Sequence, residues 1–129
     1  MSLRSPLSRV EGLGSAKEGT AHWWAQRVTA VALVPLTLWF LISLLTLPGL
    51  DYETVHTWLA VPVTGFLAIL LVAVLTYHSY LGTQVIVEDY VNSSGMKVLS
   101  LMVLRFLYVL AGGAGIFAIL RAVFGFSRL

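Results

Sequence analysis

Long stretches without charge alternate with short polar segments along this chain. The first stretch runs from Val28 to Leu47, and its 20 residues carry no charged side chain. A helix of about 20 apolar residues crosses the hydrocarbon core of a bilayer, which is roughly 30 Å thick. We therefore predict a first transmembrane helix over residues 24–47, with a kink at Pro35 because proline removes one backbone hydrogen bond.

The second uncharged stretch is longer than one crossing requires. It runs from Trp58 to Val87 and contains 30 residues, which is too few for two crossings and predicts one long or tilted helix over residues 58–87. Leu47-Pro48-Gly49 is expected to end the first helix, because proline and glycine terminate helices. Asp51 and Glu53 then predict a short acidic loop between the two spans.

A third apolar stretch follows a polar connection over residues 88–97. It predicts a third transmembrane helix over residues 98–124, with Arg105 and Arg121 near its two ends, where long arginine side chains can reach the headgroups. Residues 111–115, Ala-Gly-Gly-Ala-Gly, place small side chains four positions apart. This spacing pairs Ala111 with Gly115 and favours close packing of helices in membranes.

Composition also assigns the whole chain to the membrane class. Of its 129 residues, 58% are hydrophobic and 11% are charged, whereas soluble domains have about 45–50% apolar and about 25% charged residues. We predict an all-α membrane protein with one domain over residues 1–129, built from three transmembrane helices and a polar tail over residues 1–22. The tail is expected to be flexible or to lie on the surface, and not to be a signal peptide, because no small-residue cleavage site follows the first apolar run.

Charge and cysteine content exclude several classes of function. The formal net charge is only +2, and the basic residues lie near the ends of apolar runs rather than on one face, so the electrostatic footprint of a nucleic-acid-binding protein is missing. The chain has no cysteine, which excludes disulfides, thiolate metal sites and iron–sulfur ligation within it. A redox centre must therefore depend on histidine or be bound non-covalently.

The basic residues are distributed unevenly around the predicted helices. Arg27 and the N-terminal tail carry positive charge, as do Lys97 and Arg105 beside the second connection, whereas the first loop carries none. Cytoplasmic segments of membrane proteins hold the excess of lysine and arginine. We predict a cytoplasmic N-terminus, since Arg121 and Arg128 at the opposite end do not outnumber the other basic residues.

His78 is the candidate for chemistry inside the membrane. An ionisable residue within a span is costly, so it requires a partner and marks a possible functional site. A neutral imidazole offers one nitrogen lone pair, which is what haem iron requires of an axial ligand. Gly82 lies one turn away on the same helix face, where a flat ring could approach the backbone. The alternative is a histidine that only hydrogen-bonds a neighbouring helix.

The segment His22-Trp23-Trp24-Ala25-Gln26-Arg27 precedes the first span. Adjacent tryptophans with a basic residue are typical of a headgroup anchor, and this explains Trp23 and Trp24 without any chemical role. Arg27 is different, because its guanidinium lies at the polar side of the span. It could pair with an anionic group such as a haem propionate or, equally well, with a lipid phosphate.

Glu88-Asp89-Tyr90 ends the predicted second span. A tyrosine hydroxyl beside a carboxylate at the membrane surface could donate a hydrogen bond to a quinone carbonyl and relay protons to it from water. The alternative is an interfacial tyrosine beside a solvated acidic pair, which is the commoner arrangement.

These features together resemble a known family. The segment HWWAQRVTA leads into the first span, and His78 is followed by Gly82 four residues later and by Asp89-Tyr90 at 11 and 12 residues. In a chain of three spans, this constellation resembles the small hydrophobic membrane-anchor subunit, of cytochrome b type, of bacterial succinate dehydrogenase, respiratory complex II. The resemblance extends from about His22 to the third span.

The resemblance implies partners, cofactors and residue roles. The anchor would form a haem-binding bundle with a second three-helix cytochrome b subunit and would dock a flavoprotein subunit and an iron–sulfur subunit at the bacterial inner membrane. His78 would be one axial ligand of haem b, with Arg27 and Gly82, and less firmly His22, around the cofactor. Tyr90 and Asp89 would contribute to the site at which ubiquinone is reduced. The implied reaction is oxidation of succinate with electrons passed to ubiquinone, with no dicarboxylate or flavin chemistry in this chain.

Two other classes of function remain open at the level of sequence. A haem-free structural anchor would keep the three spans, and His78 would then bond only another helix. A small transporter component is the other alternative. Such proteins require an ionisable coupling residue near the membrane midplane and usually show repeat symmetry, and His78 alone does not make a proton path.

Overall fold

The computed structural model describes residues 17–125. Within that range the chain forms one short and three long helices, which are α2 (Lys17–Thr46), α3 (Tyr52–Ala60), α4 (Pro62–Tyr90) and α5 (Ser94–Phe124). The three long helices are each long and apolar enough to cross a membrane. The predicted all-α fold with three spans is therefore confirmed, and the described residues contain no strand.

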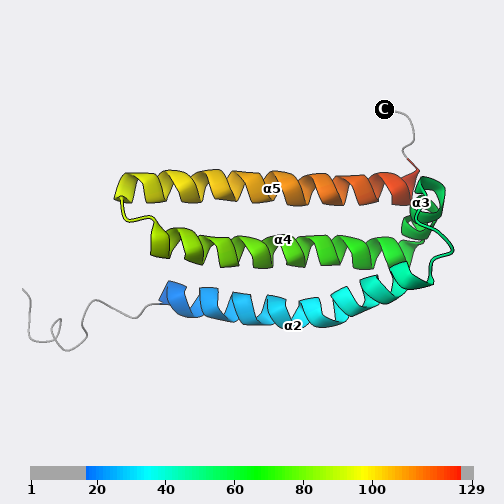
Figure 1. Cartoon of the computed structure of the whole chain (residues 1–129), viewed down its shortest axis with the longest axis horizontal. Helices are drawn as coiled ribbons and strands as arrows, with labels where there is room; N and C mark the ends of the chain where they lie inside the picture. Colours follow the sequence, from blue (N-terminus) through cyan, green and yellow to red (C-terminus); the bar gives the residue numbers. More distant parts are fainter. Residues whose placement is uncertain (1–16, 126–129) are drawn as a thin grey trace, which may run out of the picture.

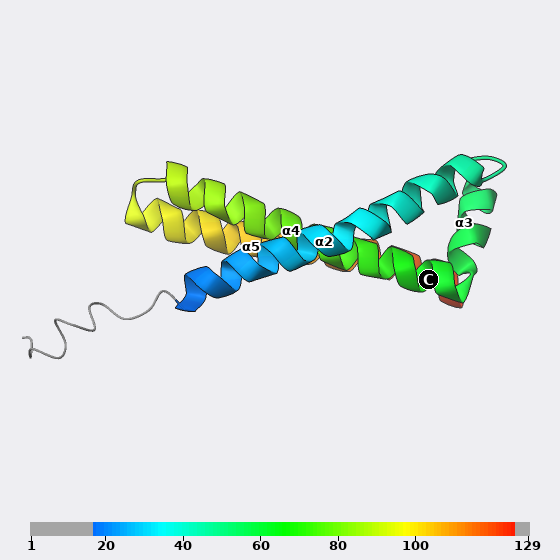
Figure 2. The ribbon, with the colours of Figure 1, turned by 90° about the horizontal axis from the view of Figure 1, so that it is seen from below.

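The long helices lie side by side with α4 in the middle (Figure 1). The helix α4 packs against both α2 and α5, whereas no part of the α2 backbone comes close to that of α5. Figure 2 shows that α2 crosses the α4–α5 pair obliquely, so that α2 diverges from α4 toward both ends. At one end α3 closes this gap. At the other, which we call the N-terminal end because α2 begins there, the gap stays open.

The first helix begins earlier than the sequence analysis predicts. It starts at Lys17, seven residues before position 24, so residues 17–22 of the predicted polar tail are helical. The polar segment contains no proline, and a helix can continue into the headgroup region because its own hydrogen bonds satisfy the backbone. Figure 1 shows α2 bending in its middle part, where Pro35 lies within the helix. Residues 1–16 of the predicted tail lie outside the described part of the chain.

The prediction of one helix over residues 58–87 is wrong at its start. The uncharged stretch is divided at Val61, whose extended backbone (φ −66°, ψ 122°) ends α3 and precedes Pro62, the first residue of α4. Proline disfavours a helical conformation at the preceding residue but is well accommodated in a first helical turn. The expected acidic loop is instead the start of α3, where Asp51 caps the helix by accepting from the Thr54 backbone N–H at 3.1 Å.

The connection at the N-terminal end is shorter than predicted. The helix α4 continues to Tyr90 and α5 begins at Ser94, so the polar segment 88–97 contracts to the three residues 91–93. The last helix ends at Gly125, which adopts a left-handed conformation (φ 65°, ψ 26°). Glycine is the residue that most readily takes this conformation at a helix end.

Glycines allow α4 and α5 to approach closely, but not in the predicted pairing. A Cβ added at Gly112 would lie 2.9 Å from Cγ2 of Thr76, and one at Gly115 would lie 3.0 Å from Cγ1 of Val72. Ala111, which was predicted to pair with Gly115, is exposed, whereas Gly112 is buried. The contact face therefore includes the 112 and 115 positions, one turn apart, as i, i+3 neighbours on a helix are.

Most large apolar side chains of the long helices are exposed. Six hydrophobic side chains are buried among the described residues, namely Leu36, Ala68, Leu71, Leu81, Ile119 and Ala122. Exposed apolar surface of this extent is characteristic of a protein that faces lipid or other subunits. The multi-pass membrane localisation that the sequence predicts is confirmed.

Candidate cofactor cleft and membrane-surface residues

His78 faces the first helix from the middle helix. Its Nδ1 lies 2.8 Å from the hydroxyl oxygen of Thr29 on α2. The same oxygen lies 2.7 Å from the carbonyl oxygen of Ala25 and 3.1 Å from that of Gln26. The hydroxyl therefore has three polar neighbours within hydrogen-bond distance.

The geometry of this group favours one histidine tautomer. Thr29 has one hydroxyl proton, and the Ala25 and Gln26 carbonyls, which can only accept, lie within its reach. The hydroxyl oxygen then accepts from Nδ1–H of His78, which satisfies both side chains. In the neutral ring this leaves the Nε2 lone pair available. The tautomer is assigned from these hydrogen-bond partners.

A cleft of about 600 Å³ lies between α2 and α4 toward the N-terminal end. We call this candidate site the cofactor cleft. Four of the predicted site residues line it together, and these are His22, Arg27, His78 and Gly82. At Gly82 an added Cβ would meet only the Gln26 side-chain nitrogen, at 3.7 Å. The backbone at Gly82 is thus open to the cleft, as the sequence analysis expects.

Trp23, before the first span, lies against the guanidinium of Arg27. The Arg27 Cζ lies 5.3 Å from the centre of the Trp23 ring, within the range of a cation–π contact. Trp23 and Trp24 are 52% and 58% exposed. This exposure agrees with the reading of both tryptophans as headgroup anchors, while Arg27 and Trp23 also border the cleft.

Two polar atoms beside the cleft have no hydrogen-bond partner within the described part of the chain. They are Nε2 of His22 and Oε1 of Gln26, and both are fully buried. A buried polar atom left without a partner is costly, so these two atoms are suited to meeting a polar group from outside this chain. Gln26 and Thr29 were not singled out from the sequence, since only the packing of α2 against α4 brings them to His78 and Gly82.

The predicted quinone residues lie apart from the cleft. Asp89 and Tyr90 are exposed at the end of α4, and Tyr90 is 81% exposed. They follow His78 by 11 and 12 residues, which corresponds to about 16 and 18 Å along a helix. The structure therefore does not bring Asp89 and Tyr90 together with His78. Both residues lie at the N-terminal end of the bundle.

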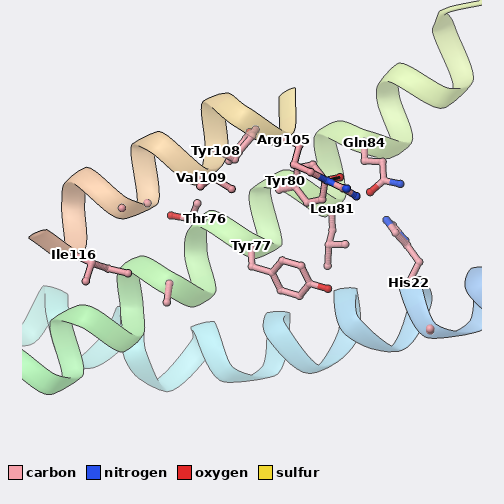
Figure 3. A pocket seen from close by; sticks show the side chains of 14 residues that line it. His22, Thr76, Tyr77, Tyr80, Leu81, Gln84, Arg105, Tyr108, Val109 and Ile116 are labelled. Atoms are coloured by element: carbon pink, nitrogen blue, oxygen red, sulfur yellow. Dashed lines mark hydrogen bonds between the residues drawn. The ribbon is translucent and has the colours of Figure 1, made fainter. Parts of the chain in front are cut away.

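A second groove lies between α4 and α5 at the same end of the bundle (Figure 3). Its volume is about 670 Å³. Among its lining residues, Nε of Arg105 donates to the hydroxyl of Tyr80 at 3.4 Å. The hydroxyl of Tyr108, which also lines the groove, lies 2.9 Å from that of Thr83. His22 projects from α2 toward this groove (Figure 3). From the sequence, Arg105 was expected only to reach the headgroups.

Comparisons with known proteins show the family to which the chain belongs. Residues 1–112 match the family of succinate dehydrogenase/fumarate reductase transmembrane subunits. The succinate dehydrogenase hydrophobic membrane anchor subunit of Rickettsia bellii is 38% identical over 96 residues, covering 73% of this chain and 75% of that protein. The subunit of the same name from Paracoccus denitrificans is 38% identical over 93 residues, covering 72% of each chain. That of Rickettsia typhi is 27% identical over 116 residues, covering 90% of this chain and 93% of the relative.

The fold and the cleft define a multi-pass helical membrane protein with a histidine-containing cleft between its first two spans. The chain belongs to the succinate dehydrogenase/fumarate reductase transmembrane subunit family. The resemblance inferred from HWWAQRVTA and the His78 to Tyr90 constellation is confirmed at the level of the family. A multi-pass protein of the bacterial inner membrane is consistent with the three candidate spans and with these bacterial relatives.

Proposed function

We propose that this chain is the membrane anchor of a succinate:quinone oxidoreductase. In this role it seats a flavoprotein subunit and an iron–sulfur subunit, holds haem b together with a second three-helix anchor subunit, and contributes to the site of ubiquinone reduction. The names of the relatives support the anchor role. The single observation that carries the haem part is the hydrogen bond between Thr29 and His78 inside the cofactor cleft.

That hydrogen bond supports haem ligation because it leaves the required atom of His78 free. Metal-ligating histidines commonly donate the other ring N–H to an oxygen, which fixes the tautomer and the ring orientation. With Nδ1–H donated to Thr29, the Nε2 lone pair is the one available to an iron. A bound haem would supply a one-electron carrier. The open backbone at Gly82 fits the approach of a flat ring.

Arg27 supports the same proposal through its charge. Its guanidinium borders the cleft and lies against Trp23. A guanidinium presents several N–H donors in a plane and suits a carboxylate such as a haem propionate. The buried Nε2 of His22, which has no partner among the described residues, offers a further polar contact at the same side.

Tyr90 and Asp89 are proposed to act at the membrane surface on the quinone. The hydroxyl of Tyr90 donates a hydrogen bond to a quinone carbonyl, and the Asp89 carboxylate next to it relays protons from water. Their exposure at the end of α4 leaves both side chains accessible to a quinone held between subunits. Electrons arrive from a cluster in another subunit, since this chain has no cysteine.

The proposed orientation places the N-terminal end of the bundle in the cytoplasm. Arg27, Lys97 and Arg105 lie toward that end, whereas the α3 end carries Arg121 together with Asp51 and Glu53. An excess of basic residues favours the cytoplasmic side. The soluble subunits would then dock beside Tyr90.

Replacement of His78 tests the haem proposal directly. In the complex purified through a tag on this chain, His78→Ala should remove the low-spin b-type signal from the reduced-minus-oxidised spectrum, while the other subunits still co-purify. His56→Ala, on α3 at the other end, is the matched control and should leave the spectrum unchanged.

The outcomes separate the haem-holding anchor from the haem-free anchor. The bond from His78 to Thr29 also satisfies what a haem-free anchor requires, namely a histidine that bonds a neighbouring helix. An unchanged haem signal in His78→Ala would support that second reading. Failure of the tagged chain to bring down a flavoprotein and an iron–sulfur protein would contradict both.

A further inference from the structure

We propose that the groove between α4 and α5 binds one anionic phospholipid, with its phosphate at Arg105 and an acyl chain along Gly113. This groove shares only His22 with the cofactor cleft, and the proposal does not depend on haem. The first reason is the position of Arg105, a permanently charged residue within the third span. Its only described hydrogen bond is the 3.4 Å contact to the Tyr80 hydroxyl, and no carboxylate of the described residues pairs with it.

The level of Arg105 in the bilayer suits a lipid phosphate. Arg105 and Arg121 are 16 residues apart on α5, which is about 24 Å along a helix. The hydrocarbon core is roughly 30 Å thick, so the two arginines lie just inside its two boundaries. Side chains on a helix lean toward its N-terminus, and for Arg105 this is the direction of the nearer membrane surface. A guanidinium at this depth can reach a phosphate.

The lining of the groove changes from polar to apolar along its length. Figure 3 shows Arg105, Gln84 and His22 gathered at one end, with Ile116 at the other. From Arg105 to Ile116 the groove extends over 11 residues of α5, or about 16 Å. One leaflet of the hydrocarbon core is roughly 15 Å deep. A groove that is polar at its Arg105 end and apolar toward Ile116 over this length fits an amphiphile that enters from the bilayer surface.

Gly113 provides the space for the acyl chain. A Cβ added at Gly113 would meet no heavy atom within 4 Å, whereas one added at its neighbour Gly112 would lie 2.9 Å from Thr76. Gly112 thus lies at the close contact between α4 and α5, whereas the groove wall at Gly113 has free space beside it. The volume of about 670 Å³ lies within the range of about 300–1,000 Å³ that is usual for small-molecule sites.

A lipid fits this groove better than an acidic side chain of another subunit does. A carboxylate would satisfy Arg105 but would leave the apolar half of the groove, toward Ile116, to be filled separately. A phospholipid supplies both an anion and an apolar chain in one molecule, and it is present wherever this chain is inserted. The exposed Val109 and Gly113 on the groove wall leave a lateral path from the bilayer.

The test measures phospholipid retained by the complex purified through this chain. After a delipidating detergent wash, the complex is exposed to vesicles of phosphatidylglycerol or of phosphatidylcholine, and bound lipid is counted by native mass spectrometry. Two variants probe the site, Arg105→Gln at the polar end and Gly113→Leu on the groove wall. Ala114→Leu is the matched control, because it adds the same side chain one position along α5, where residue 114 does not line the groove.

The wild type should retain one phosphatidylglycerol and about fivefold less phosphatidylcholine, since one basic residue near the surface contributes roughly 1 kcal/mol, equivalent to fivefold. Arg105→Gln should remove this preference, Gly113→Leu should remove binding of both lipids, and Ala114→Leu should behave as wild type. Inorganic phosphate should not displace the lipid.

Several results would overturn the proposal. Equal retention of both lipids by wild type would exclude a charge-selective site, and equal losses in Ala114→Leu and Gly113→Leu would show a general disturbance of α5. Loss of a protein subunit from Arg105→Gln with lipid retention unchanged would assign Arg105 to a partner's carboxylate. The comparison of the two lipids on wild type and Arg105→Gln decides the matter even if Gly113→Leu fails to assemble.

Discussion

The hydroxyl of Thr29 has three polar neighbours and a single proton, and this arrangement favours one role for His78. With the proton directed to the Ala25 and Gln26 carbonyls, the oxygen accepts from Nδ1–H of His78. The role of His78 as a candidate was predictable from its isolation in an uncharged stretch. The role of Thr29 was not, since 49 residues separate the two and only tertiary packing pairs them.

Replacement of Thr29 should weaken haem binding without removing the ligand. Thr29→Val keeps the shape of the side chain and removes the acceptor, so haem retention should fall about 10–100-fold, as for other outer-shell partners of metal ligands. The reduction potential of remaining haem should rise, because His78 becomes a less basic ligand. Both are read from redox-titrated spectra of the purified complex.

Two further variants make the Thr29 result specific. Thr29→Ser should restore the wild-type potential. Thr37→Val is the matched control, because Thr37 makes the same hydrogen bonds within α2, to the Leu33 and Val34 carbonyls, and has no described partner on another helix. Equal effects of Thr29→Val and Thr37→Val would show that the loss arises within α2 and not at His78.

Asp51 gives a prediction outside the membrane spans. The Thr54 hydroxyl donates to its Oδ2 at 2.6 Å and the Thr54 backbone N–H to its Oδ1 at 3.1 Å, and these bonds hold the pKa of Asp51 below its ordinary value of 3.8. Because the folded pKa is depressed, the cap stabilises α3 fully above pH 3.8 and is lost as the pH falls through the lower, folded pKa.

Titration by nuclear magnetic resonance can check the Asp51 prediction. The pKa of Asp51 should lie below 3.8 in wild type and should return toward that value in Thr54→Val. Protection of the α3 amides from exchange, relative to the intrinsic exchange rate at each pH, should fall at pH values below the measured pKa. A wild-type pKa at or above 3.8 would contradict the capping account.

At the scale of the elements, apolar length predicted the number of spans but not their ends. The division at Val61–Pro62 and the helical start at Lys17 both follow from backbone chemistry that charge-free length does not report. Proline is well accommodated in the first turn of a helix, so α4 can begin at Pro62. Pro35 lies inside α2, where a proline bends the helix. No charged residue marks the break within residues 58–62, and the break there is set by proline.

Gly65 marks the place where three helices meet. A Cβ at this buried position would overlap Cγ2 of Val123 on α5 and would lie 3.0 Å from the Leu59 carbonyl oxygen of α3. Neither atom belongs to a flexible side-chain end, so Gly65→Ala should destabilise the chain by about 1–3 kcal/mol, as overpacking of a close contact does.

Thermal unfolding of the detergent-solubilised complex, followed by circular dichroism, measures this effect. Gly95→Ala is the control, since a Cβ there meets nothing within 4 Å, and it should be neutral or stabilise slightly because alanine favours helices. A Gly65→Ala variant as stable as Gly95→Ala would show that α3 and α5 do not pack against Gly65 as described.

At the scale of the whole molecule, the two candidate chemistries lie at different depths of one bundle. His78 lies within the cofactor cleft, and Tyr90 lies about 18 Å further along α4, at the surface where soluble subunits would dock. A hydrogen bond to a quinone carbonyl strengthens as negative charge develops on the oxygen. Tyr90 can therefore be tested separately from haem binding.

Tyr90→Phe should lower quinone reduction while leaving succinate oxidation intact. The ring keeps its packing and loses one donor, so quinone reduction should fall about tenfold or more, each factor of ten corresponding to roughly 1.4 kcal/mol of barrier. Oxidation of succinate by a soluble dye that takes electrons upstream should not change. Both rates are measured on the same membranes, and their ratio is compared with wild type.

Tyr52→Phe provides the control for this measurement. Tyr52 is also highly exposed, at 79% compared with 81% for Tyr90, but it lies at the α3 end of the bundle. Its ratio should equal that of wild type. If the ratio for Tyr90→Phe is also unchanged, Tyr90 is an interfacial anchor and the quinone site lies in the partner subunits.

The sequence by itself determined the membrane class, the three spans and the family resemblance, because each depends on local composition and on spacing along the chain. It also identified His78, Gly82 and Arg27 as candidate site residues, and the structure places all three in one cleft. Their positions were predictable because helical periodicity and the span boundaries limit where such residues can lie. Tertiary structure alone decided the rest. The register of α2 on α4 pairs Thr29 with His78, and the rotation of α5 buries Gly112 and leaves Gly113 open. Register and rotation depend on side-chain contacts between residues far apart in sequence, which apolar length and periodicity do not encode.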